Sequence, residues 1–77
     1  MDTFVDARRL LCPLPLIRAE AAMKPLPPGA ILVIQATDRG LHQDLPAWCA
    51  MHGHTLLEIR NEGREILARV RKGPPTP

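Results

Sequence analysis

The sequence predicts an α/β fold, a two-layer sandwich in the order β-α-β-α-β-β. Its four-stranded mixed sheet would carry two helices packed on one face. Short runs rich in β-branched residues alternate with two segments of helical periodicity. Glycine and proline separate these segments, as they do at turns. The chain has 77 residues, enough for one domain whose two helices each bury a stripe against a single sheet.

The first strand and the first helix are expected near the N-terminus. Residues 3–5 favour a short strand, and residues 7–11 a loop. The helix is predicted from Cys12 to residue 23 or 24, because the prolines of its opening segment suit a first turn, where backbone N–H groups lack intrahelical partners. Three apolar residues at positions i, i+3 and i+7 predict its stripe: Leu14, Ile17 and Ala21.

Residues 30–36 are a continuous apolar run that predicts a central strand buried on both faces, or nearly so. A second helix is predicted from about residue 41 to 52, on residues with helical spacing: Leu41, Leu45, Trp48, Cys49 and His52. An interior proline costs about 3 kcal/mol. We therefore expect the regular helix to begin near Asp44, as its N-cap, with Pro46 in the first turn. Gly53 is expected to end it.

The last third of the chain predicts a hairpin. Strands over residues 54–60 and 65–71 are joined by a turn at residues 61–63, which ends in glycine. In the second strand, apolar residues alternate with charged ones and predict one covered face. Residues 1–72 are thus expected to form a single domain, and residues 73–77 a flexible Pro-rich tail.

Composition excludes several classes of function. The only aromatic residues besides histidine are Phe4 and Trp48, too few for a nucleic-acid reader built on stacking. A net charge of +2 is too small to indicate a phosphate-backbone binder. No apolar run is long enough to span a membrane, and no secretory signal is recognisable. Two cysteines make no disulfide framework, so we expect a cytoplasmic protein with reduced thiols.

Cys12 is the leading candidate for a reactive group. As the N-cap of a helix it would lie at the positive end of the helix dipole, which lowers a thiol pKa. Pro13 and Pro15 would stiffen the first turn and fix the direction of the side chain, although each removes an N–H donor. Arg8 and Arg9 would add positive potential. The alternative is a cysteine that serves as a small core residue.

The chain resembles the TusA (SirA-like) family of small sulfur carrier proteins, from about Asp6 to Lys72. The resemblance rests on a Cys-Pro-x-Pro motif, an Asp six residues before it and a second block after the central strand. These residues are Cys12-Pro13-Leu14-Pro15, Asp6, Ala36-Thr37-Asp38, Asp44-Leu45-Pro46-Ala47-Trp48-Cys49 and Gly53-His54. The family fold is a two-layer α/β sandwich of the kind predicted above.

The resemblance implies that Cys12 carries sulfur as a persulfide. The donor would be a cysteine desulfurase or a rhodanese-type sulfurtransferase, and a downstream protein would accept the sulfur for tRNA thiolation, molybdenum-cofactor supply or sulfur oxidation. The chain would then be a sulfurtransferase-type carrier rather than a stand-alone enzyme. It would need no cofactor, no metal, no membrane and no specific nucleic acid. A non-catalytic interaction or regulatory module, acting through the sheet or the basic hairpin, remains the alternative.

Two positions near Cys12 bear on the loop. The family usually has glycine three residues before the cysteine, where this chain has Arg9. If that glycine serves a positive φ, Arg9 would be strained or the loop rerouted. Asp6 is expected to accept hydrogen bonds from loop amides, because a carboxylate beside the thiol would raise its pKa.

The remaining polar residues have mainly structural interpretations. Cys49 is predicted to be buried, Asp38 and Asp44 to serve turns and caps, and the basic residues of the hairpin to be solvated or to contact a partner. A zinc site of Cys12, Cys49, His52 and His54 lacks the usual close-spaced pairs. Redox sensing through the two cysteines is a further alternative.

Overall fold

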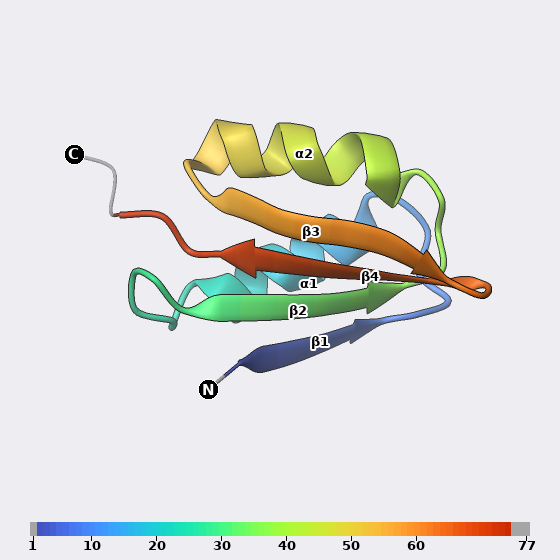
Figure 1. Ribbon diagram of the computed structural model, residues 1–77, viewed down its shortest axis with the longest axis horizontal. Coiled ribbons are helices and arrows are strands. Elements are labelled where there is room, and N and C mark those ends of the chain that lie inside the picture. The colour runs from blue at the N-terminus through green and yellow to red at the C-terminus, as the bar shows by residue number, and fades with distance from the viewer. Residues whose placement is uncertain (1, 75–77) are drawn as a thin grey trace.

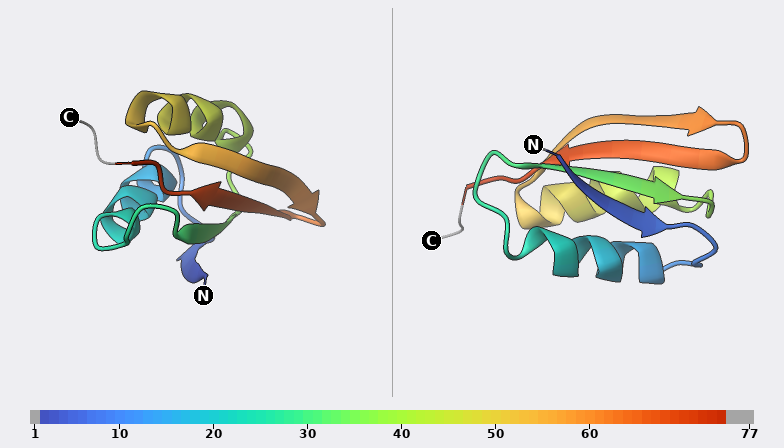
Figure 2. Two further views of the ribbon diagram at one scale, coloured as in Figure 1. Left: turned by 60° about the vertical axis from the view of Figure 1, so that its left-hand side comes forward. Right: turned by 90° about the horizontal axis from the view of Figure 1, so that it is seen from below.

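The computed structural model describes residues 2–74 and confirms the predicted sandwich. The elements, in chain order, are β1 Thr3–Ala7, α1 Leu14–Met23, β2 Ile31–Ala36, α2 Leu41–His52, β3 Thr55–Glu62 and β4 Glu65–Arg71. The strands form one mixed sheet, and both helices lie against the same face of it (Figure 2). Within the described residues, neither helix combines the length and the apolar character that spanning a membrane requires.

The strand order β1-β2-β4-β3 places the apolar strand β2 inside the sheet, as expected (Figure 1). β1 runs parallel to β2, with Ala7 opposite Ala36, while β4 is antiparallel to both β2 and β3. The carboxyl ends of parallel strands point the same way. The loops that follow β1 and β2 therefore meet at one end of the molecule, at the right in Figure 1.

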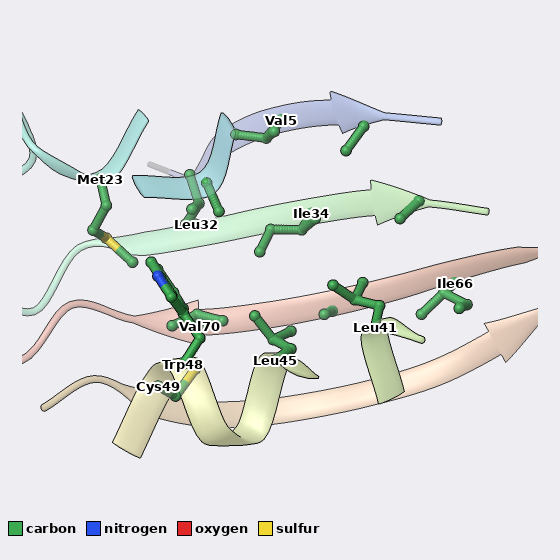
Figure 3. Close-up of a cluster of buried hydrophobic side chains, with 14 residues drawn as sticks. Val5, Met23, Leu32, Ile34, Leu41, Leu45, Trp48, Cys49, Ile66 and Val70 are labelled. Carbon is green, nitrogen blue, oxygen red and sulfur yellow. The ribbon is translucent and has the colours of Figure 1, made fainter. Parts of the chain in front are cut away.

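The core lies between the sheet and the two helices (Figure 3). Leu32 and Ile34 of β2 are fully buried, and β4 contributes Val70. The predicted stripe of α2 is confirmed, because four of its five members are buried: Leu41, Leu45, Trp48 and Cys49. These side chains converge on the sheet from α2, and Met23 closes the core from the end of α1.

The predicted stripe of α1 is wrong. Leu14, Ile17 and Ala21 are exposed, and the helix buries the row Pro15, Ala19 and Met23 instead. Ala19 is fully buried, and its small side chain lets the helix lie close to the sheet. The two large apolar side chains that this rotation leaves exposed, Leu14 and Ile17, belong to the half of α1 nearest Cys12.

The predicted start of α2 at Asp44 is also wrong. The helix begins at Leu41 with Gly40 as N-cap, and Pro46 lies inside it. Asp38 closes the turn before the helix, because its side-chain Oδ1 accepts from the Gly40 N–H at 3.1 Å and its carbonyl from the Leu41 N–H at 3.1 Å. Pro46 lacks the N–H of a regular helical hydrogen bond, and the helix nevertheless continues to His52.

The turns and the C-terminal segment follow the glycine signals. Gly53 ends α2 at φ +73°, and Gly63 at φ +64° belongs to the hairpin turn between β3 and β4. Gly73 is buried, and its N–H donates to His54 Nδ1 at 3.0 Å. Residues 75–77 of the predicted tail lie outside the described residues.

We expect Leu32→Ala to lower the free energy of unfolding by about 2–5 kcal/mol, since it removes a fully buried side chain and leaves a cavity. Leu57→Ala is the matched control, because Leu57 is 41% exposed on β3 and its truncation should change stability by less than about 0.5 kcal/mol. Urea unfolding followed by circular dichroism measures both. Equal losses in the two variants would contradict the placement of Leu32 in the core.

Candidate functional site

Cys12 lies exposed in the loop between β1 and α1, and Asp38 holds that loop in place. The Cys12 backbone N–H donates to Asp38 Oδ2 at 2.8 Å. The other oxygen of the same carboxylate accepts from Gly40. Asp38 therefore performs the predicted turn chemistry and also ties the cysteine loop to the start of α2.

Asp44 brings a second carboxylate to the cysteine, which the sequence did not predict. Its Oδ2 lies 2.7 Å from Cys12 Sγ, so the thiol donates a hydrogen bond to the carboxylate. Asp44 reaches the sulfur because α2 begins at Leu41 and places residue 44 in the first turn. The expected N-cap role of Asp44 is wrong. The available signal was an acidic residue early in the helix that follows β2, at the end of the sheet where the Cys12 loop also lies.

The surroundings of Cys12 raise the pKa of its thiol above the ordinary cysteine value. The hydrogen bond to Asp44 is the main cause, followed by desolvation and by the negative charges of Asp44 and Asp38. Each of these favours the neutral thiol over the thiolate. The prediction of a lowered thiol pKa at a helix N-terminus is therefore wrong.

The N-terminus of α1 explains why the helix does not acidify the thiol. Pro13, not Cys12, is the N-cap, so the predicted position of the cysteine is off by one residue. Pro13 and Pro15 have no N–H, the Leu14 N–H donates to the Leu11 carbonyl at 2.9 Å, and the Leu16 N–H donates back to Pro13 at 3.1 Å. These first-turn groups are thus satisfied locally and do not point at the sulfur.

Arg8 and Asp6 neutralise each other beside the loop. Asp6 accepts the Arg8 backbone N–H at 3.1 Å, which confirms its expected bond to a loop amide, and it pairs with the Arg8 guanidinium at 2.9 and 3.0 Å. These bonds lower the pKa of Asp6 to about 2. Arg8 also lies 3.5 Å from Glu65. With two carboxylate partners, Arg8 adds little positive potential at Cys12.

Arg9 occupies the position where a positive φ was anticipated. Its φ is +67°. For a residue other than glycine, this left-handed conformation costs about 1–2 kcal/mol relative to the right-handed one. The Arg9 N–H donates to Thr37 Oγ1 at 2.9 Å, from the segment after β2. The loop thus keeps the path that glycine would allow, and Thr37 helps to hold it.

The other candidate residues lie away from Cys12 or are engaged elsewhere. Cys49 is 3% exposed, as predicted, and burial raises its pKa to about 11. His52 and His54 each place a ring 5.2 Å from Trp48, at the opposite end of α2 from Asp44. Across residues 2–74, no three His, Cys, Asp or Glu side chains are grouped as metal ligands.

The basic residues of the hairpin are partly paired on its surface. Arg60 lies 3.5 Å from Glu58 and 3.2 Å from Glu62. Lys72 donates from Nζ to three carbonyls at the end of α1: Met23, Lys24 and Leu26. Lys72 therefore caps the helix C-terminus, where a cation is favourable.

Residues 3–72 match the protein family described as "Sulfurtransferase TusA". The chain belongs to the TusA family. Over 72 residues it is 43% identical to the "Putative sulfur carrier protein YrkI" of Bacillus subtilis, covering 94% of this chain and 96% of that protein. It is 35% identical over 72 residues to "Sulfur carrier protein TusA" of Pseudomonas paraeruginosa, covering 94% and 91%.

A solved structure supports the TusA-family fold. The SirA-like protein from Desulfitobacterium hafniense superposes with a TM-score of 0.80, over 94% of this chain and 99% of that one, at 23% sequence identity. The two-layer sandwich with its mixed sheet is therefore shared with a SirA-like protein.

Replacing Asp44 with Asn should lower the pKa of Cys12, because it removes the negative charge from the group that accepts the thiol hydrogen bond. At mildly alkaline pH, below the thiol pKa, we expect iodoacetamide to alkylate Cys12 about fivefold faster in Asp44→Asn than in the wild type. That factor corresponds to repulsion between unit charges about 4 Å apart in water. Rates against pH are measured by peptide mass spectrometry. Glu20→Gln removes a remote charge and should change nothing, and identical profiles for Asp44→Asn and wild type would contradict the contact.

Replacing Arg9 with Gly should raise the free energy of unfolding by about 0.5–1 kcal/mol, because glycine adopts a positive φ without strain and this gain exceeds its added unfolded-state entropy. Arg64→Gly is the matched control in the hairpin turn, at a residue whose φ is not positive, and it should not stabilise the protein. Thermal or urea unfolding measures both. Destabilisation of Arg9→Gly would show that the side chain outweighs the backbone strain.

Proposed function

We propose that this chain is a sulfur carrier that holds sulfur as a persulfide on Cys12. It would receive the sulfur from a cysteine desulfurase or a rhodanese-type donor and pass it to an acceptor protein. The observation that carries the proposal is the exposed Cys12 thiol, fixed by Asp38 at one end of a TusA-family domain. The pathway fed would be tRNA thiolation, molybdenum-cofactor supply or sulfur oxidation.

The transfer is an exchange between thiols and persulfides. Cys12 Sγ attacks the outer sulfur of the donor persulfide, a new S–S bond forms at Cys12, and the donor S–S bond breaks. The donor leaves as a thiol, so the sulfur atom moves without any net oxidation or reduction. Such an attack needs an attacking sulfur that another protein can approach, and Cys12 is exposed.

The surroundings of Cys12 suit a carrier better than a stand-alone enzyme. The hollow beside the thiol has no room for a bound molecule, and its lining consists of Cys12, Pro15, Leu16, Asp38, Leu41 and Asp44. A small substrate would therefore find little to hold it there. The remaining catalytic groups would come from the donor and the acceptor.

Apolar side chains next to Cys12 offer a surface on which such a partner can dock. Leu11 is 72% exposed, Leu14 47% and Ile17 54%. Clustered exposed apolar residues commonly mark interaction sites. A protein that covers them would bring its own reactive group near the exposed thiol.

Incubation with a cysteine desulfurase and cysteine, or with a rhodanese and thiosulfate, should add the mass of one sulfur atom to the wild-type chain. Peptide mass spectrometry should place it on Cys12, and Cys12→Ala should abolish it. Cys49→Ala is the matched control and should still load, because that thiol is buried. Equal labelling of Cys12→Ala and wild type would overturn the proposal.

A further inference from the structure

The contact between Cys12 and Asp44 has opposite consequences for the empty and the loaded carrier. In the empty carrier the neutral thiol donates a favourable hydrogen bond to Asp44 Oδ2, 2.7 Å away. A persulfide is more acidic than a thiol and is ionised near neutral pH. The loaded Cys12 therefore has no proton to donate, and its negative charge faces the Asp44 carboxylate.

The other charged groups around Cys12 do not compensate this repulsion. Asp38, before α2, adds a second negative charge that bears on the thiol. In the cysteine's own loop, Arg8 is paired with Asp6 and Glu65. Arg9 is not among the groups that shift the pKa of the Cys12 thiol. The Leu14 and Leu16 N–H groups at the start of α1 already donate to nearby backbone carbonyls, so they add little stabilisation to the persulfide anion.

We propose that Asp44 makes Cys12 a weak sulfur-holding site, stabilising the discharged carrier relative to the loaded one. This inference rests on the proposed carrier function and adds a thermodynamic direction to it. Transfer of sulfur from Cys12 to an acceptor thiol would be favoured at equilibrium, because discharge restores the S–H to carboxylate hydrogen bond. Asp44 would be a residue that tunes the equilibrium, in direct contact with the reacting sulfur.

The proton balance of the exchange involves the same carboxylate. With a persulfide anion as donor, loading converts a Cys12 thiol and R–S–S⁻ into Cys12–S–S⁻ and R–SH. The Cys12 Sγ bonds to the outer sulfur, the donor S–S bond breaks, and the Cys12 proton passes to the leaving sulfur. In the empty carrier, Asp44 Oδ2 accepts the hydrogen bond made by that proton. In discharge the proton returns to Cys12, so no oxidant or reductant is required.

The test measures how sulfane sulfur partitions between this protein and glutathione. The chain is equilibrated with fixed ratios of glutathione persulfide and glutathione, and intact mass spectrometry gives the loaded fraction. Near neutral pH, Asp44→Asn should hold sulfur with an equilibrium constant about fivefold above wild type, as expected for removal of repulsion between unit charges about 4 Å apart in water. Asp44→Glu should stay close to wild type, and Glu20→Gln, far from the site, should match it.

The pH dependence separates this electrostatic role from a structural one. As the pH falls and the persulfide becomes protonated, the repulsion disappears and the Asp44→Asn and wild-type constants should converge. Equal constants near neutral pH, or a difference that persists under acid conditions, would overturn the role of Asp44 and leave the carrier function standing. No sulfur on Cys12 in wild type or in Asp44→Asn would reject both. Circular dichroism confirms that the variants are folded.

Discussion

The parallel pairing of β1 with β2 decides where the functional groups of this protein meet. With Ala7 opposite Ala36, the chain leaves both strands at the same end of the sheet. The first loop brings Cys12 and the second brings Asp38, and the hydrogen bond from the Cys12 N–H to Asp38 joins them. The direction of α2 then follows from the same Asp38, and Asp44 reaches the sulfur as a consequence.

This arrangement accepts local strain for the sake of position. Arg9 adopts a left-handed φ, and Pro46 interrupts the hydrogen bonds of α2. Neither feature stabilises a small domain, whose stability margin is thin. They are tolerated because the core between the sheet and the helices is compact and without buried polar or charged residues in the described chain.

The sequence predicted the architecture well because its signals were local. The apolar run at residues 30–36 indicated β2, and the apolar stripe from Leu41 to Cys49 indicated α2. Gly53 indicated where α2 ends. The stripe of α1 failed because apolar residues lie on two sides of that helix, and the packing of Ala19 against the sheet decided between them. The start of α2 failed because a long-range turn residue, Asp38, outweighed the local proline rule.

The raised pKa of Cys12 could not be predicted from local sequence signals, because it depends on a contact between distant residues. The position of Cys12 before a helix suggested an acidic thiol, but the two prolines and their neighbours leave its first-turn N–H groups satisfied. Asp44 is thirty-two residues away in sequence and approaches only because two loops share an edge. The position of a cysteine before a helix therefore says little about its thiol pKa when proline removes the N–H donors that would stabilise the thiolate.

A carrier places different demands on its cysteine than an enzyme does. An enzyme that forms a covalent intermediate benefits from a stable thiolate, whereas a carrier must be emptied as readily as it is filled. Raising the thiol pKa favours the emptied state at equilibrium but makes the Cys12 sulfur a slower leaving group. Loaded protein would therefore be thermodynamically unstable toward an acceptor but slow to lose its sulfur without one. A docked partner that supplies the proton to Cys12 would release it, which couples discharge to recognition.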